Sequence, residues 1–191
     1  MLKIVTPPAI EPVSLAEIES YLRLDISTDS AENAFRTGLI VTAREYCEGY
    51  QRRVYITQTL EMTLDKFPSG VINVPRGNLQ SIVSIKWKDS LGIEHPLTVE
   101  TDYIYSTSGI LGRIAPVNSW PSGSLYGLDP IKIQFICGYG LTASSVPLRV
   151  RQAIYMLVSY WYDNRTAAGT VNKEMEFSVK ALLNLDRIAV V

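Results

Sequence analysis

Apolar positions recur at helical spacing near the start of the chain. Within residues 30–50 they step by four, four, three and four positions, at Phe35, Leu39, Ala43, Tyr46 and Tyr50. This is the 3.6-residue period of a helix with one buried face. A shorter helix is expected before it, because residues 14–17 read Ser-Leu-Ala-Glu, a capping box whose Ser and Glu side chains satisfy free backbone N–H groups. The sequence therefore predicts two helices near the N-terminus.

From residue 54 the period changes to two. Within residues 57–64, three threonines and Glu61 alternate with a more apolar set, the pattern of a strand with one solvent-facing side. Further short strands are predicted at 71–74, 81–88, 93–99, 103–106, 110–114 and 131–137. Residues 89–92, Asp-Ser-Leu-Gly, read as the turn of a β-hairpin. Residues 116–130 are rich in Pro, Gly and Ser and are expected to form a loop.

The order of predicted elements sets the expected fold class. A helix is expected from Pro147 to about residue 164, followed by a short helix near 179–185. Helices, then strands, then helices indicate the α+β class. We expect mostly α-helical N- and C-terminal segments around a small antiparallel sheet or hairpin insertion. We also expect one α+β domain over residues 1–170 and a C-terminal arm with a short helix over 171–191, which binds a partner.

The helix expected after Pro147 has an unusual composition. Residues 153–162, Ala-Ile-Tyr-Met-Leu-Val-Ser-Tyr-Trp-Tyr, are apolar or aromatic nearly all the way round. Such a helix is buried on several sides, and two interpretations remain open. It is either a central core helix between the sheet and the long second helix, or it packs on the sheet with one side and on another subunit with the other. Aromatic rings with polar tips are enriched at interfaces.

The second interpretation names a set of candidate interface residues. The end of the chain contributes to it, because chain ends are usually polar unless something binds them and this one is apolar. The candidates on the helix and on the tail are Tyr155, Tyr160, Trp161, Tyr162, Phe177, Leu182, Leu183 and Ile188.

Composition and charge narrow the function classes. The chain has 191 residues, of which 47% are hydrophobic and 19% charged, so it can form a sizeable core without metal or disulfide. Its net charge of −1 lacks the basic excess of a dedicated DNA-binding domain. Cys47 and Cys137 are expected to be buried, reduced thiols. No signal peptide or membrane span is evident, so an intracellular protein without membrane contact is expected.

The sequence contains almost no motif typical of an enzyme. His95 is the one histidine, and no nucleophile motif accompanies it. One His and two isolated Cys cannot form a spaced zinc site, and the phosphate-binding glycine motifs are absent. We therefore expect no catalytic residues, no metal and no cofactor, and a protein that is not an enzyme.

Ordered short motifs resemble one family over about residues 11–187. The N-terminal motifs are Glu-Pro-Val-Ser-Leu-Ala-Glu at 11–17, Tyr-Leu-Arg-Leu-Asp at 21–25 and Ala-Arg-Glu-Tyr-Cys-Glu at 43–48. Later ones are Val-Pro-Arg at 74–76, Gly-Arg-Ile at 112–114, Trp-Pro at 120–121, Gly-Tyr-Gly at 138–140, Arg-Gln-Ala-Ile at 151–154 and Trp-Tyr at 161–162. Together they resemble the head–tail connector (head-completion adaptor) proteins of tailed bacteriophages and prophages. Gly77, where proline is expected, and residues 185–187, which lack an aromatic before the arginine, depart from that pattern.

The resemblance implies a structural role in virion assembly. It implies a dodecameric ring that docks on the portal protein, extends the DNA channel and receives the next head-completion or tail protein. The C-terminal region, 177–191, would reach onto the portal, and DNA would pass without sequence-specific binding. The protein would lie in the host cytoplasm during assembly and then at the head–tail junction of the virion. The near-neutral charge suits a channel wall past which DNA slides.

Two other functions remain open. A DNA-packaging factor would contact DNA directly through a phosphate-facing stripe of arginines, namely Arg36, Arg44, Arg52 and Arg53. An enzyme would need carboxylates that distant segments bring together in one pocket.

Overall fold

A computed structural model describes residues 1–24, 29–165 and 173–189. The chain divides into two compact units, and the backbone passes from one unit to the other three times. Unit 1 comprises Met1–Ala9 and Thr57–Tyr139, and unit 2 comprises Ile10–Ile56 and Gly140–Val191.

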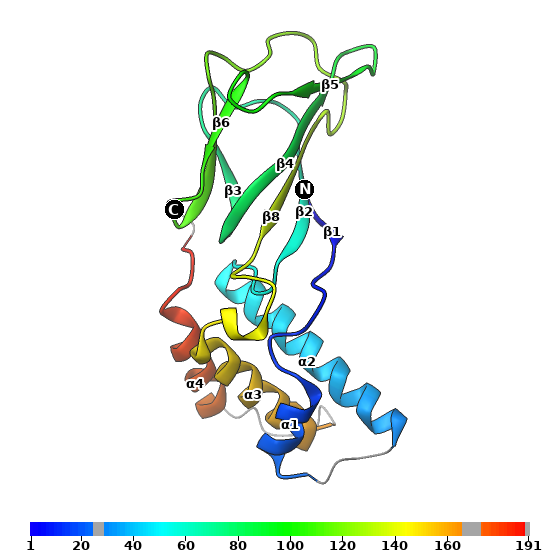
Figure 1. Cartoon of the computed structure of the whole chain (residues 1–191), viewed down its shortest axis with the longest axis vertical. Coiled ribbons are helices and arrows are strands. Elements are labelled where there is room, and N and C mark those ends of the chain that lie inside the picture. The colour runs from blue at the N-terminus through cyan, green and yellow to red at the C-terminus, as the bar shows by residue number, and fades with distance from the viewer. Residues whose placement is uncertain (25–28, 166–172, 190–191) are drawn as a thin grey trace. The chain divides into compact units, whose positions relative to one another are not determined.

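Unit 1 is built from two antiparallel sheets (Figure 1). The larger has the strand order β1-β2-β8-β4-β5, with β1 at Leu2–Thr6, β2 at Gln58–Leu64, β8 at Ile131–Cys137, β4 at Leu79–Lys88 and β5 at Glu94–Leu97. The smaller has the order β3-β7-β6, with β3 at Ile72–Gly77, β7 at Leu111–Pro116 and β6 at Tyr103–Ser106. The expected hairpin is confirmed, because β4 pairs with β5 from Ile85 opposite Leu97 to Lys88 opposite Glu94.

The core of unit 1 lies between the inner faces of these sheets. Strand β8 alternates strictly, with its odd-numbered residues buried and its even-numbered residues partly exposed. The buried side chains of the larger sheet include Leu60, Met62, Ile85, Ile133 and Phe135, and those of the smaller sheet include Ile72, Val74, Tyr103 and Ile114. The smaller sheet contacts the larger at Gly112 of β7, where an added Cβ would lie 2.1 Å from Leu79 Cδ2 of β4. Glycine is required there because no larger residue fits.

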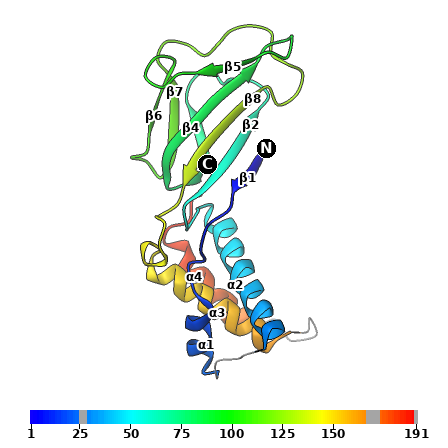
Figure 2. The same ribbon diagram turned by 45° about the vertical axis from the view of Figure 1, so that its right-hand side comes forward.

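Unit 2 is helical (Figure 2). Its helices are α1 at Leu15–Leu22, α2 at Ser30–Gln51, the short 3₁₀ helix η1 at Ala143–Ser145, α3 at Leu148–Asp163 and α4 at Lys173–Asn184. The predicted capping box is confirmed, because Ser14 accepts from the Glu17 N–H and Glu17 accepts from the Ser14 N–H. At the start of α2 the Asp29 carboxylate accepts from the Ala31 N–H, which supplies an acceptor for an N–H that has no partner within the helix.

Helix α3 lies at the centre of unit 2 and contacts α1, α2 and α4. Within residues 153–162 no side chain is fully exposed, and Ala153, Ile154, Leu157 and Val158 are buried. The helix is apolar all the way round because other helices surround it. The sheet that we expected to cover it belongs to unit 1.

The prediction of mostly helical segments around a small sheet or hairpin insertion is wrong. Of the residues that the structure describes, helices account for 34% and strands with isolated bridges for 31%, and the strands form two antiparallel sheets. The error has a physical cause. The pairing of β3 with β7 joins residues about 40 apart in sequence, and β1 pairs with β2 across more than 50 residues. Local periodicity carries no information about such distant partners, and it gave no signal at all for β1.

Candidate assembly interface

Tyr155 belongs to a partly exposed aromatic pair on unit 2. Its ring stacks on Tyr21 of α1 with 5.1 Å between centroids, and its hydroxyl accepts from Arg151 Nη2 at 3.3 Å. Arg151 also pairs with Glu17. A hollow of about 450 Å³ is lined by these two tyrosines, Glu17 and two small residues of α1. The pair therefore presents a flat aromatic surface beside a fixed ion pair.

The aromatic end of α3 packs against α2. Trp161 meets Tyr46 edge to face with centroids 6.3 Å apart, and Tyr162 lies 6.4 Å from Phe35. The guanidinium of Arg165 covers Phe35 at 4.6 Å and Tyr162 at 4.8 Å from the ring centroids. Tyr46 and Phe35 remain 39% and 36% exposed. Aromatic and cation–π contacts fix these rings while leaving one side of them accessible.

Tyr160 completes the predicted aromatic set. It is partly exposed, and its carbonyl accepts from both the backbone N–H and the side-chain amide of Asn164, which ends the helix. The predicted set therefore lies in two places. Tyr155 stacks on α1, whereas Trp161 and Tyr162 contact rings of α2. Tyr21, Phe35 and Tyr46 belong beside the predicted residues, although the sequence gave no reason to select them for an interface.

The C-terminal segment packs on unit 2 in part. Leu183 is fully buried and Ile188 is 6% exposed, Leu182 is partly buried, and Phe177 is 74% exposed. Gln51 connects this segment to α2, since its side-chain amide donates to the Leu183 carbonyl at 2.6 Å and its carbonyl accepts from the Ile188 N–H at 3.1 Å. Two of the predicted tail residues thus contact the chain itself, and Phe177 faces solvent.

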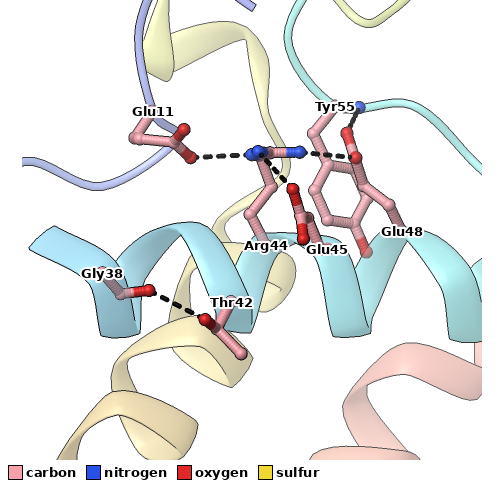
Figure 3. A network of polar contacts seen from close by, with 7 residues as sticks. All are labelled: Glu11, Gly38, Thr42, Arg44, Glu45, Glu48 and Tyr55. Atoms are coloured by element: carbon pink, nitrogen blue, oxygen red, sulfur yellow. Dashed lines mark hydrogen bonds and ion pairs between the residues drawn. The ribbon is translucent and has the colours of Figure 1, made fainter. Parts of the chain in front are cut away.

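A buried arginine organises the centre of α2 (Figure 3). The Arg44 side chain is 4% exposed, and it pairs with Glu11 at 2.8 Å, Glu48 at 2.9 Å and Glu45 at 3.4 Å. Glu48 also accepts the backbone N–H of Tyr55 at 2.8 Å. The network therefore ties the segment before α1 and the segment after α2 to the middle of α2. Charge-assisted hydrogen bonds of this kind hold backbone segments in fixed positions.

This burial bears on the arginine stripe proposed for direct DNA contact. Arg36 is also buried, with its guanidinium 2.8 Å from Glu19. Arg53 donates to the Asp186 carbonyl at 2.7 Å, and Arg52 is exposed at the C-cap of α2. Two of the four arginines are thus committed to internal carboxylates and cannot face phosphate in this fold. The stripe does not form.

The surroundings of Cys47, Cys137 and His95 determine what chemistry these side chains allow. Burial raises the pKa of Cys47 and of Cys137 to about 12, so both remain thiols at neutral pH and lack the nucleophilic thiolate form. His95 Nε2 lies 2.8 Å from Asp89, and this contact holds the pKa of Asp89 below its usual range. Among the described residues no group of three or more His, Cys, Asp or Glu could hold a metal ion. Across the same ranges, no helix is long and apolar enough to span a membrane.

Comparison with known proteins adds information from structure. The sequence matches no protein-family profile and no curated protein. Three solved structures match over 100% of this chain and 97% of theirs. They are the neck of an empty gene transfer agent (GTA) particle with C6 symmetry (TM-score 0.85, 22% identity), the virion of a native GTA particle (0.82, 20%) and the neck of a native GTA particle with C12 symmetry (0.76, 21%). The chain has the fold of a protein found in GTA necks. At these identities the likeness establishes the fold, over the full length of both chains.

Proposed function

We propose that this protein is a structural subunit of the neck of a phage-like virion, where it forms a head–tail connector ring. The observation that carries the proposal is the match in fold to chains of GTA necks, at TM-scores of 0.76 to 0.85 over nearly the whole of both chains. The symmetries reported for those necks, C6 and C12, are those of rings of identical copies. The sequence resemblance to head–tail connectors points to the same role, which is structural and not catalytic.

The partners proposed are other copies, the portal protein and the next head-completion or tail protein. The candidate contacts are the partly exposed rings at Tyr155, Tyr160, Trp161 and Tyr162 and the exposed side of the C-terminal segment. Large rings held in place by neighbours bury much area on association at little entropic cost. Phe177 is the most exposed ring among the candidates, so we assign it and the 171–191 segment to partner contact. Assembly would take place in the host cytoplasm, and the ring would remain at the head–tail junction with DNA passing through it.

Native mass spectrometry of the full chain tests this proposal, alone over a range of concentrations and then mixed with the portal protein of the same genome. A ring, or a complex that forms only on mixing, is expected. Trp161→Glu should reduce assembly, because a charge placed against Tyr46 is desolvated when the interface closes. Arg52→Glu, a charge change at an exposed position, is the control. A chain that remains monomeric with the portal at every concentration would contradict the proposal.

A further inference from the structure

Four lysines lie on one face of the larger sheet of unit 1. Strand pairing places Lys132 of β8 directly opposite Lys86 of β4, and Lys88 follows Lys86 by two residues on the same face. Lys3 on β1 lies opposite Glu61 of β2, on the other side of β8. Like charges directly opposite in a sheet are destabilising, and Lys86 and Lys132 are such a pair. The fold thus maintains an unfavourable juxtaposition.

Of the carboxylates near these lysines, Glu61 is buried beneath Lys3, whereas Glu94, opposite Lys88 in the sheet, and Asp129 lie at the surface. The Glu61 side chain is 7% exposed, and Lys3, which is 60% exposed, contacts it at 3.0 Å. The amide of Gln134 donates to the other oxygen of Glu61 at 2.9 Å, and this bond with that of Lys3 holds the pKa of Glu61 below its usual range. Glu94 pairs with Lys86 at 2.8 Å near the surface. At this pair the Lys3 ammonium therefore faces solvent while the Glu61 carboxylate is buried. The Lys86–Glu94 pair is exposed, so its ion pair is weak.

Lys88 and Lys132 have no ion pair within 4 Å among the residues that the structure describes. Together with Lys3 they line a hollow of about 410 Å³, which also contains Thr63, Tyr126 and the exposed carboxylate of Asp129. Lys88 Nζ lies 6.0 Å from the Tyr126 ring centroid. Thr63, opposite Lys132 in the sheet, has a hydroxyl oxygen that is buried and makes no hydrogen bond in the described structure. Two ammonium groups without an ion pair to any described residue therefore line this hollow.

We propose that this lysine face, defined by Lys3, Lys86, Lys88 and Lys132, binds the phosphate backbone of double-stranded DNA without reading its sequence. The inference rests on the proposed function, which supplies DNA as the polyanion that passes the protein. Adjacent strands lie about 4.8 Å apart. Lys3 on β1 and Lys86 on β4 are three strand spacings apart, so the face extends about 14 Å across the sheet. That is the length over which one strand of a duplex presents about four phosphates. A flat face of a sheet can follow such a row, whereas a small anion would need a closed pocket.

The binding expected from one subunit is weak, because carboxylates offset part of the positive charge. Weak contact suits DNA that must move, and a ring would repeat the face around the duplex and add up small contributions. This location is compatible with the net charge of −1, because a chain with 18 basic and 19 acidic residues can still gather a few lysines on one face.

Fluorescence anisotropy of a labelled 20-base-pair duplex with the full chain tests the proposal. If about three phosphates are neutralised, a plot of the logarithm of the association constant against the logarithm of the salt concentration should have a slope of about −2.7. The affinity should then fall about 40-fold between 25 and 100 mM salt. The double variant K88Q/K132Q should bind about tenfold more weakly at 25 mM salt and reduce the slope by about 2. The matched control R23Q/R52Q removes two exposed arginines of unit 2 and should bind like the unchanged protein. Circular dichroism of each variant verifies folding.

Several results would overturn the inference. These are no binding at 25 mM salt, equal loss in the arginine control, or displacement of the duplex by inorganic phosphate at constant ionic strength, which would indicate a small-anion site. The native-mass experiment separates this inference from the proposed function.

If K88Q/K132Q still assembles and loses DNA binding, both the lysine face and the ring are supported. If assembly occurs and the unchanged protein ignores DNA, only the lysine face is refuted. If K88Q/K132Q binds DNA normally and fails to assemble, the face is an interface between copies instead. DNA binding by a chain that never assembles would refute the ring alone.

Discussion

The buried Arg44 network makes a sharp prediction about stability. Arg44→Met keeps most of the side-chain volume and removes the guanidinium, which leaves Glu48 charged with its side chain 11% exposed. Removing one partner of a buried ion pair typically costs about 3–5 kcal/mol, since the remaining charge is buried without compensation. Glu48 keeps the Tyr55 N–H, and water reaches Glu11, which is 23% exposed. We therefore expect the low end of the range, about 3 kcal/mol.

Urea denaturation followed by circular dichroism at 222 nm measures this loss in the helices. At a slope of about 1.5 kcal/mol per molar urea, the midpoint should fall by about 2 M. Glu45→Gln is the matched control, because Glu45 is 60% exposed and an exposed pair contributes at most about 1 kcal/mol. The deficit of Arg44→Met should also shrink as the pH is lowered, since an unpartnered buried carboxylate takes up a proton readily. A loss below about 1 kcal/mol that does not vary with pH would refute the reasoning about buried charge.

Two further predictions concern unit 1. Gly112→Ala should destabilise it by about 2 kcal/mol, because the new Cβ would meet Leu79 at 2.1 Å. Gly123→Ala, in the same unit with open space around it, is the control, and an unchanged melting temperature for Gly112→Ala would contradict the packing argument. The lowered pKa of Glu61, held by the Gln134 amide and by an ammonium, contributes stability above the unfolded value of about 4.3, and this is lost as pH falls through the lower folded pKa. The unfolding free energy of Glu61→Gln should therefore vary less with pH below about 4.5, and equal acid sensitivity in both proteins would argue against this contribution.

Helix existence could be predicted from the sequence, but the buried face of α2 could not. Of the apolar positions predicted to face the core, Ala43 is buried, but Phe35 and Tyr46 are exposed to more than a third. Arg36 and Arg44, which were placed off that face, are buried. An arginine can be buried when carboxylates from distant segments reach it, here from Glu11 and Glu19, both outside α2. A pattern within one helix does not contain that information.

The strands show the same division between local and distant information. The alternation in β8 and the β4–β5 turn were readable because their signals are contiguous. The lysine face was present in the sequence only as Lys86 and Lys88 at a spacing of two and as Lys132 between two isoleucines. Its assembly depends on β8 lying between β2 and β4. Sheet order brings these residues together, and local sequence does not specify it.

The C-terminal segment allows the two roles expected for it to be separated. Its apolar composition suggested a partner, and the structure supplies one within the chain for Ile188, which is 6% exposed and whose N–H donates to α2. Ile188→Ala should therefore lower the unfolding free energy by about 2 kcal/mol, at the low end for such truncations because the site is near the chain end. Phe177→Ala, at a ring 74% exposed, should change stability by less than about 0.5 kcal/mol and reduce assembly with the portal. Urea denaturation and native mass of the same two variants make the comparison. If Phe177→Ala assembles normally, the exposed side of the segment is not a partner surface, and if Ile188→Ala is as stable as the unchanged protein, the tail is not held by its own helices.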